Sequence, residues 1–334
     1  VVGPGPAMRL TRDVILFTTR EMPKWNPMNV CSYHLQEAGA TPVQELSYAL
    51  ATSIAVLDEV KKAGLSDADF AESAQRISFF VNAGMRFVTE LCKMRAFNVL
   101  WDEILKNRYG VSDAKARRFR YGVQVNSLGL TEQQPENNVY RILLETLAVT
   151  LSKNARARAV QLPAWNEALG LPRPFDQQWS LRMQQILAYE TDLLEYGDIF
   201  DGSTVIAAKV AELAEAARAE IAAIDAMGGA VSAVDSGYMK SKLVESNAKR
   251  LAAIEAGEQI VVGVNRFTET EASPLTAGDG AIMVVPDHVE AEQIQGLEAW
   301  RSARDGKAVE QALADLEKAA REDSNIMPAS IAAA

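Results

Sequence analysis

Short apolar runs alternate with long amphipathic stretches over the first two hundred residues of the chain. Four of the runs have the length and the β-branched or aromatic content of buried strands: MNVCSY (28–33), RISFFV (76–81), FRYGVQV (119–125) and RARAVQL (156–162). Each run precedes a stretch with helical spacing: 41–62, 84–106, 135–151 and a segment that ends near 189. In the first helix the apolar positions share one face: Leu46, Leu50, Ile54 and Leu57. Four strand–helix units in a row predict an α/β fold with parallel strands covered by helices.

Two parallel architectures compete for this order of elements. A doubly wound sheet favours Gly-rich turns, but the chain contains neither G-x-G-x-x-G nor G-x-x-x-x-G-K. A (β/α)₈ TIM-type barrel places its chemistry at the carboxyl ends of its strands. Polar residues gather at the predicted strand ends, namely His34, Ser78, Gln124 and Gln161. We therefore predict half of a TIM-type barrel over residues 1–202, with the other half upstream.

The composition changes after FDGST (200–204). Ala- and Glu-rich patterns predict helices over 205–227 and 238–257. The run QIVVGVNRF predicts a strand, and the residues 289–322 predict charged amphipathic helices. These patterns predict a mainly helical, solvated linker over 203–334, and we assign no chemistry to His288. Both ends of the chain are expected to be cut from something longer. VVGPGPAMRL begins like a strand entering a Pro/Gly loop, and NIMPASIAAA stops within a helical pattern.

The charge and cysteine content narrow the classes of partner. A net charge of −10 argues against nonspecific binding to nucleic acid, although a local arginine cluster can still bind an anionic substrate. Cys31 and Cys92 have no CxxC spacing, which predicts buried, reduced thiols in a cytoplasmic protein. No apolar run approaches the roughly 18 residues of a membrane span. We expect neither nucleic acid nor membrane among the partners.

The predicted strand ends carry a set of residues suited to binding a polar substrate. His34 can donate or accept a hydrogen bond, Arg76 and Arg120 can neutralise a carboxylate or phosphate, and Ser78 and Gln124 are neutral donors. Glu37 and Glu167 can accept hydrogen bonds from hydroxyl groups. Alternatives remain open: a core histidine, arginines in structural salt bridges, and an ordinary exposed helical Glu167. There is no zinc ligand set and no G-x-S-x-G, so we expect a cofactor to carry the chemistry.

Long strings of the sequence resemble a known enzyme family. PKWNPMNVCSYHLQEAGAT, RISFFVNAGMRF, SLGLTEQQPENN and NARARAVQLPAWNEALGLPRPFDQQWSLRMQQILAYE are similar to the adenosylcobalamin-dependent acyl-CoA mutases of the methylmalonyl-CoA mutase family. The resemblance extends essentially from end to end. It implies barrel strands five to eight, followed by the linker to a cobalamin-binding domain. The D-x-H-x-x-G motif that supplies the cobalt ligand is not in this sequence, so we expect no metal ligand here and no turnover by this chain alone.

The resemblance also assigns roles to individual positions. It implies that His34, with Tyr33 beside it, hydrogen-bonds the thioester carbonyl of the substrate. The positions that it places on the acyl-CoA path are Arg76, Ser78 and Phe80. The positions that it places at the substrate-facing end of the seventh strand are Arg120 and Gln124. The positions that it places near the corrin or the adenosyl ribose are Glu37, Ser127, Leu128 and Glu167.

Two positions depart from the family pattern. Methylmalonyl-CoA mutases have a histidine where this chain has Gly122, and the smaller residue leaves room for an ethyl branch on the acyl chain. They also have an asparagine where this chain has Pro163, so the resemblance supports no adenosyl contact there. We therefore expect a radical isomerase that interconverts ethylmalonyl-CoA and methylsuccinyl-CoA. The alternatives are a methylmalonyl-CoA/succinyl-CoA enzyme and a non-catalytic assembly fragment that needs a partner chain.

The resemblance further implies how the reaction is assisted and what accompanies the chain. His34 would supply partial proton transfer to the thioester carbonyl oxygen while the carbonyl group migrates. The barrel would exclude water from the radicals. The expected partners are an acyl-CoA substrate, a second copy of the full-length protein in a homodimer, and a chaperone GTPase that loads cobalamin.

Overall fold

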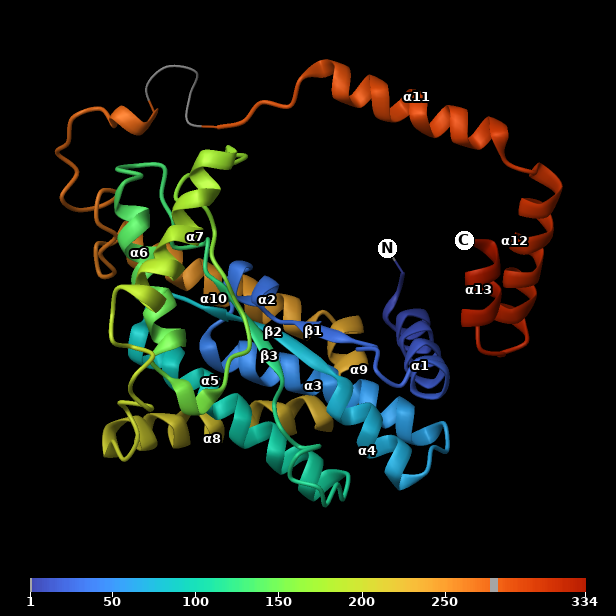
Figure 1. The fold of residues 1–334 in the computed structure, drawn as a ribbon. Coiled ribbons are helices and arrows are strands. Elements are labelled where there is room, and N and C mark those ends of the chain that lie inside the picture. The colour runs from blue at the N-terminus through green and yellow to red at the C-terminus, as the bar shows by residue number, and fades with distance from the viewer. Residues whose placement is uncertain (1, 277–281) are drawn as a thin grey trace.

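The computed structural model describes residues 2–276 and 282–334, and a four-stranded parallel sheet lies at its centre. The strands are β1 (Asn29–Cys31), β2 (Ser78–Ala83), β3 (Tyr121–Val125) and β4 (Val160–Gln161). They are ordered β1-β2-β3-β4, so each strand pairs in parallel with the next one along the chain. Helices connect the strands, as the sequence predicts (Figure 1). The predicted α/β class is confirmed.

The two faces of the sheet differ in burial. On one face the side chains are buried among those of the helices, as at Val30, Phe79, Val81, Tyr121 and Val123. The opposite face, which we call the open face, carries the exposed or half-buried residues Asn29, Cys31, Ser78, Phe80 and Gly122, and only near the carboxyl ends of β2 and β3 does it carry the buried Asn82 and Gln124. A doubly wound sheet is covered on both faces, whereas a barrel wall has helices on its outer face only. The sheet therefore has the layering of part of a TIM-type barrel.

Helices α3 (Pro42–Lys62), α5 (Phe87–Glu103) and α6 (Asn137–Thr150) cover the buried face of the sheet, and α8 (Thr204–Ala226) packs against α3 and α5. A π-helical turn over Ile104–Arg108 extends α5. Helix α3 begins with a capping box, in which Thr41 and Gln44 satisfy each other's backbone N–H groups. The apolar face predicted for α3 is buried, with Leu46, Leu50 and Leu57 fully inaccessible to solvent.

The other helices of the body are α1 (Pro4–Glu21), α2 (Tyr33–Glu37), α4 (Asp67–Arg76), α7 (Pro174–Tyr189), α9 (Ala230–Asp235) and α10 (Tyr238–Glu255). Single 3₁₀ turns occur at Lys153–Ala155 and Pro274–Thr276. Two strand predictions are wrong. The segment predicted to open the chain as a strand end and loop is largely α1, because Pro4 at its first position suits a helix start. QIVVGVNRF forms only an isolated bridge between Val262 and Arg266.

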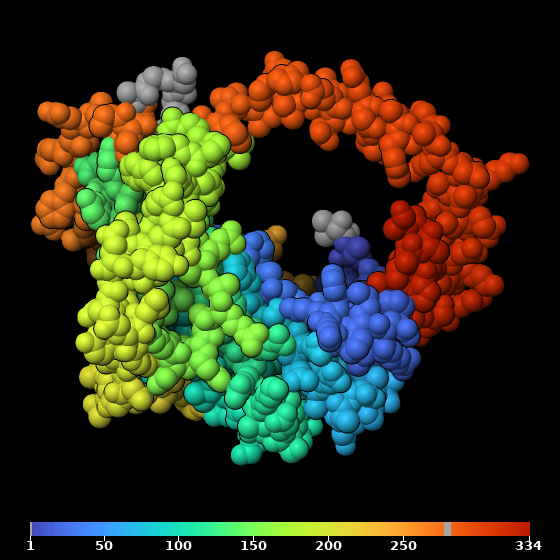
Figure 2. Space-filling view, in the orientation of Figure 1, coloured from blue at the N-terminus to red at the C-terminus, as the bar shows by residue number. Residues whose placement is uncertain are grey.

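The predicted solvated linker divides into two parts with different burial. Helix α8 is not solvated, because Ile206, Leu213 and Ala217 are buried in the main core. In contrast, α11 (Asp287–Ala303), α12 (Gly306–Arg321) and α13 (Met327–Ala333) have no buried residue. They form an arm that stands away from the body and returns to α1 (Figures 1 and 2). There Asn325 donates to the carbonyl of Asp13 at 2.8 Å.

Neither cysteine forms a disulfide, and only one is buried. Cys92 lies in the core, as predicted, but Cys31 is exposed on the open face, because the strand alternation points its side chain away from the helices. Among the described residues, no helix is both long enough and apolar enough to cross a membrane.

Candidate active site

The predicted site residues lie at two opposite edges of the sheet. His34, Gln124 and Gln161 are at the carboxyl edge, where a TIM barrel places its chemistry. Ser78 was predicted to lie with them, and this is wrong, because β2 begins at Ser78 and so places it at the amino edge. Arg76 ends α4 instead of opening the strand, so it too lies at the amino edge.

The histidine lies on a short helical turn that follows β1. Helix α2 begins directly after Ser32, so His34 is its second residue. The His34 ring lies 3.8 Å from the ring of Tyr33, with 37° between their planes, and the Tyr33 ring meets the edge of Phe80 at 5.3 Å. Burial raises the pKa of Tyr33, with the neighbouring charges of Cys31 and Glu37 adding to it. His34 itself is exposed, so the core-histidine alternative is wrong.

The Phe80 ring occupies the space next to Gly122. The two residues pair across β2 and β3, and a Cβ atom built on Gly122 would lie 2.9 Å from Cδ2 of Phe80. The space that the missing side chain leaves is therefore shared with an aromatic ring. Two residues further along β3, Gln124 is buried and donates to the carbonyl of Val125 at 3.1 Å.

Asn82 is a candidate that the sequence analysis missed. It pairs with Gln124 across the sheet and follows Ser78 and Phe80 in the alternation of β2, so it lies on the same face. Its amide nitrogen and oxygen are both buried, and neither has a hydrogen-bond partner among the described residues. A buried amide without a partner is costly, which is typical of a group that binds a ligand. The sequence signal that could have identified Asn82 is the alternation of side chains along β2, which puts every second residue on the same face.

Arginines gather at the amino edge. Arg120 lies immediately before β3 and donates to the carbonyl of Gln75 at 2.8 Å, while Arg76 contacts Glu72 of its own helix at 3.2 Å. Burial lowers the pKa of Arg120, and the positive charges of Arg158 and Arg76 lower it further. Arg158 was also missed, although it belongs to the alternating RARA (156–159) that directly precedes β4. Like charges held together in this way suit an anionic ligand.

Two carboxylates and a hydroxyl meet at the carboxyl edge. Ser127, after β3, donates its hydroxyl to Glu37 of α2 at 3.1 Å. Desolvation raises the pKa of Glu167, after β4, and the charge of Glu37 adds to this effect. The structure therefore brings together three of the residues predicted to lie near the cofactor. The fourth, Leu128, is half-buried beside them.

A buried network holds the turn that carries Glu167. Asp176 of α7 accepts hydrogen bonds from the Trp165 indole at 3.1 Å, from Asn166 at 3.0 Å and from Arg173 at 2.8 Å. Burial alone would raise the pKa of Asp176, but the hydrogen bonds and charge of Arg173, together with the hydrogen bond from Asn166, lower it. Pro163 is buried in the same segment. Because the network fixes the turn, Glu167 has a defined place opposite Glu37.

Comparison of the sequence with known protein families gives a match over the whole chain. The family model for methylmalonyl-CoA mutase matches residues 1–334. The chain belongs to the methylmalonyl-CoA mutase family. Members of this family are isomerases that include ethylmalonyl-CoA mutase and methylmalonyl-CoA mutase.

This mutase-family chain resembles curated proteins along its whole length. It is 71% identical to the ethylmalonyl-CoA mutase of Methylorubrum extorquens and 67% identical to that of Cereibacter sphaeroides, each match covering 100% of the chain. It is 36% identical to the methylmalonyl-CoA mutase of Cereibacter sphaeroides over 99% of the chain. These matches cover 49%, 51% and 45% of the three relatives. The chain therefore spans about half the length of the curated relatives it matches.

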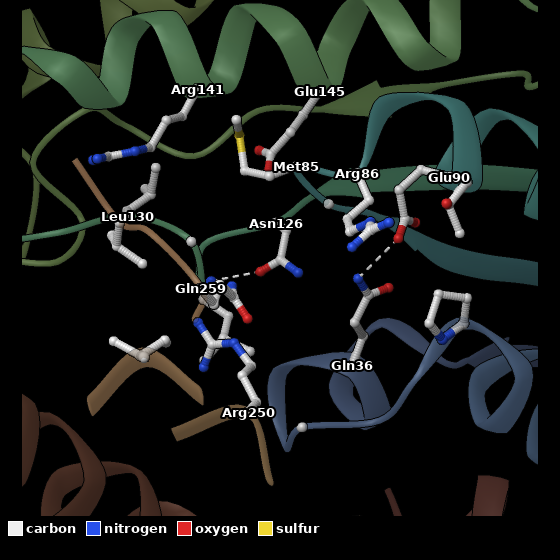
Figure 3. A pocket seen from close by; sticks show the side chains of 18 of the residues that line it. Gln36, Met85, Arg86, Glu90, Asn126, Leu130, Arg141, Glu145, Arg250 and Gln259 are labelled. Carbon is white, nitrogen blue, oxygen red and sulfur yellow. Dashed lines mark hydrogen bonds between the residues drawn. The ribbon is translucent and has the colours of Figure 1, made fainter. Parts of the chain in front are cut away.

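The mutase-family chain also has a cavity of about 1200 Å³ at the carboxyl edge. It lies between the loops after β2 and β3 and helix α10, and Gln36, Asn126 and Arg250 are among the residues that line it (Figure 3). Leu128 also lines it. The side chain of Glu145, on α6, points into this cavity (Figure 3). Both of its carboxyl oxygens are buried and have no hydrogen-bond partner in the described part of the chain. Burial, helped by the charge of Glu90, raises the pKa of Glu145 to about 9.

From the sequence we expect no metal ligand in this chain. Within residues 2–276 and 282–334, no three His, Cys, Asp or Glu side chains form a cluster that could hold a metal ion. That the cobalt ligand lies outside this chain stays a prediction.

Proposed function

We propose that the chain forms the C-terminal half, strands five to eight, of the barrel of an ethylmalonyl-CoA mutase. The observation that carries this proposal is the identity of 71% and 67%, along the whole chain, to two proteins of that name. Identity to the methylmalonyl-CoA mutase of Cereibacter sphaeroides is only 36%, although that organism also supplied one of the two closer relatives. The proposed reaction is the interconversion of ethylmalonyl-CoA and methylsuccinyl-CoA.

The open face supports a path for the acyl-CoA from one edge of the sheet to the other. Arg76 and Arg120 would bind phosphate groups of the coenzyme at the amino edge, with Arg158 as a third cation. Ser78 and Phe80 follow along β2 on the same face. The path ends at the carboxyl edge, where the acyl chain would lie among the side chains of Phe80, Asn82 and Gln124.

His34 would act on the thioester carbonyl at that end of the path. Its ring is exposed and lies against Tyr33, whose own ring contacts Phe80 of the open face, so it would be placed to donate a hydrogen bond to the carbonyl oxygen. The donation matters most when that oxygen gains negative charge, because a fixed donor then stabilises the transition state more than the ground state. Gln124 and the unpartnered Asn82 amide would fix the orientation of the acyl group.

The carboxyl edge suits the adenosyl part of adenosylcobalamin. Glu37 and Glu167 come from different strand ends and meet at Ser127, and together they present carboxylate oxygens that accept hydrogen bonds from ribose hydroxyls. When bound, the cofactor supplies the carbon radical that starts the rearrangement. The chain would bind its ribose and keep water out, while Leu128 would contact the corrin.

Several further predictions belong to this proposal. Residues 1–202 would be the barrel half and residues 203–334 a mainly helical linker toward a cobalamin-binding domain. The whole enzyme would be a cytoplasmic homodimer, loaded with cobalamin by a chaperone GTPase. Its partner in catalysis would be the acyl-CoA substrate.

A chimera tests the proposed function. The matching half of the Methylorubrum extorquens enzyme is replaced by this chain, and conversion of ethylmalonyl-CoA to methylsuccinyl-CoA is measured with adenosylcobalamin present. The expected result is turnover of ethylmalonyl-CoA with a higher specificity constant than for methylmalonyl-CoA. A folded chimera that binds cobalamin but converts neither substrate would contradict the proposal.

Gly122→His is expected to move the preference of this chimera toward methylmalonyl-CoA. The new Cβ would lie 2.9 Å from the Phe80 ring, so the ring must rotate into the path and narrow it. The ratio of the two specificity constants should change by about tenfold or more, the usual effect of one methylene in a closed pocket. Adding Phe80→Ala should restore part of the original ratio. An unchanged ratio would show that this position does not set the acyl preference.

Arg120→Gln is expected to raise KM for the acyl-CoA about tenfold while kcat changes little. A charge-assisted hydrogen bond to phosphate is worth about 1.5–3 kcal/mol and is present equally before and during the reaction. Arg158→Gln should act in the same direction. Arg118→Gln, an exposed neighbour in the same loop, is the matched control and should leave KM unchanged. Equal effects from all three variants would indicate a general loss of charge, not a phosphate site.

A further inference from the structure

Three ionisable side chains are buried together beneath the carboxyl edge. Lys93 of α5 contacts Glu45 of α3 and Glu90 of α5, each at 2.5 Å. Lys93 and Glu45 have no exposed surface, and the Glu90 side chain is 2% exposed. Buried charges are rare in proteins unless they are paired, as these are.

The cluster is tied to the turn that carries the candidate histidine. Lys93 donates to the side-chain oxygen of Gln36 in α2 at 2.8 Å. Glu45 accepts from the Ser32 hydroxyl at 2.9 Å and from the backbone N–H of Asn82 at 2.8 Å. The two bonds to α2 lie on either side of His34 in the sequence, and the third fixes the end of β2. Two elements of the carboxyl edge, α2 with its N-cap Ser32 and the end of β2, therefore depend on one buried group of charges.

Stability alone is a poor explanation for such a cluster. Replacing a buried ion pair with apolar residues of the same volume is often neutral or stabilising, so these charges need another reason. Burial alone would lower the pKa of Lys93, but Glu45 and Glu90 outweigh it and raise the pKa, so the lysine stays charged. A permanently charged donor with three N–H groups can hold two carboxylates and an amide in one fixed geometry.

We propose that Lys93 is a positioning residue: through Glu45, Ser32 and Gln36 it holds the α2 turn so that the His34 ring lies against Tyr33 and faces the open side of the sheet. The role in catalysis rests on the proposed function, but the geometric effect on His34 does not. In the described part of the chain, the hydrogen bonds and ion pairs of the Lys93 side chain are with Gln36, Glu45 and Glu90, none of which belongs to the proposed substrate path. It acts only by fixing the residues on both sides of the histidine.

The chain contains only two histidines, so their ring protons can be observed individually by NMR. The 334-residue chain is labelled with ¹³C-histidine, and His288→Gln assigns the second signal. In the parent chain the His34 ring protons are expected upfield, because the Tyr33 ring lies 3.8 Å away. Lys93→Met should remove most of this upfield displacement, because α2 loses its anchor.

A second variant guards against a general loss of folding. Ser32→Ala combined with Gln36→Ala cuts the two links to α2 but leaves the buried cluster intact, and it should remove the displacement in the same way. Asp198→Asn is the control: it breaks the partly buried Arg95–Asp198 ion pair, 2.6 Å long, which has no link to α2, and should leave the His34 signal in place. An unchanged His34 signal in a folded Ser32/Gln36 double variant would overturn the proposal.

The chimera adds a kinetic readout that keeps the two proposals apart. There, Lys93→Met should lower kcat on the order of 10²-fold with a smaller change in KM, the cost of a donor misplaced by about 1 Å. A parent chimera without activity would count against the proposed function alone, since the NMR result still decides the position of His34. A loss of the NMR displacement with kcat unchanged would overturn the catalytic part of the proposal.

Discussion

In the active chimera, His34→Ala is expected to lower kcat about 10²–10⁴-fold, the usual contribution of a positioned proton donor. The structure places the ring at the carboxyl edge of the sheet, exposed and held against Tyr33, where the thioester carbonyl would lie. In the proposed reaction the oxygen would gain charge as the carbonyl group migrates, and without the imidazole that charge would lose the donor assigned to it here. The measurement is the rate of methylsuccinyl-CoA formation at saturating substrate.

The controls for this prediction separate chemistry from binding. Cobalamin affinity should stay at the parent value in His34→Ala, because Glu37 and Ser127 retain their contact. His288→Ala, on the exposed arm, should leave the rate unchanged. Parent-level turnover in His34→Ala would remove this residue from the mechanism, whatever the fate of the rest of the site.

Glu145→Gln is expected to stabilise the chain at neutral and alkaline pH. Burial raises the pKa of Glu145 from 4.5 to about 9, so the folded chain keeps the proton while the unfolded chain releases it. Above pH 4.5 each pH unit therefore costs the folded state about 1.4 kcal/mol, which reaches about 3 kcal/mol at pH 7. The cost is absent below pH 4.5 and stops growing near pH 9. Glutamine should recover about 1–2 kcal/mol of this, because its amide is also buried without a partner.

Urea unfolding at pH 5 and pH 8 provides the measurement. The gain from Glu145→Gln should be larger at pH 8 than at pH 5, since the penalty that it removes grows between these values. Glu190→Gln is the matched control, because Glu190 is exposed and should change stability little at either pH. A Glu145→Gln gain that is the same at both pH values would show that the carboxyl group is already ionised in the folded chain.

The helices could be predicted from the sequence because their signals are local. The three-and-four spacing from Leu46 to Leu57 gives the buried face of α3, and the strand–helix alternation gives the parallel order of the sheet. The sequence did not predict that His34 lies on a helical turn. The apolar run MNVCSY extends beyond the three residues that pair in β1.

The parts of the site that depend on tertiary contacts could not be predicted in the same way. The carboxyl-edge prediction for Ser78 did not follow from the predicted strand 76–81, whose amino end already contains it, and the structure makes Ser78 the first residue of β2 because α4 continues to Arg76. Glu90 and Lys93, three residues apart on a helix, are typical of an exposed surface pair, and only the fold buries them. Likewise, the crowding of Gly122 by Phe80 is a property of strand register, which the sequence of either strand alone does not contain.

Because only one of the two cysteines is exposed, the accessibility of the open face can be followed by thiol modification. Cys92 is enclosed in the core, so Cys31 is the thiol that an alkylating reagent would reach first. Its side chain lies on the same face as Phe80 and the proposed substrate path, and it pairs with Phe80 across β1 and β2. Any molecule that covers this face, whether the remainder of a barrel or an acyl-CoA, would shield that sulfur. The rate of thiol modification thus becomes a direct measure of whether the inner wall of the sheet is occupied.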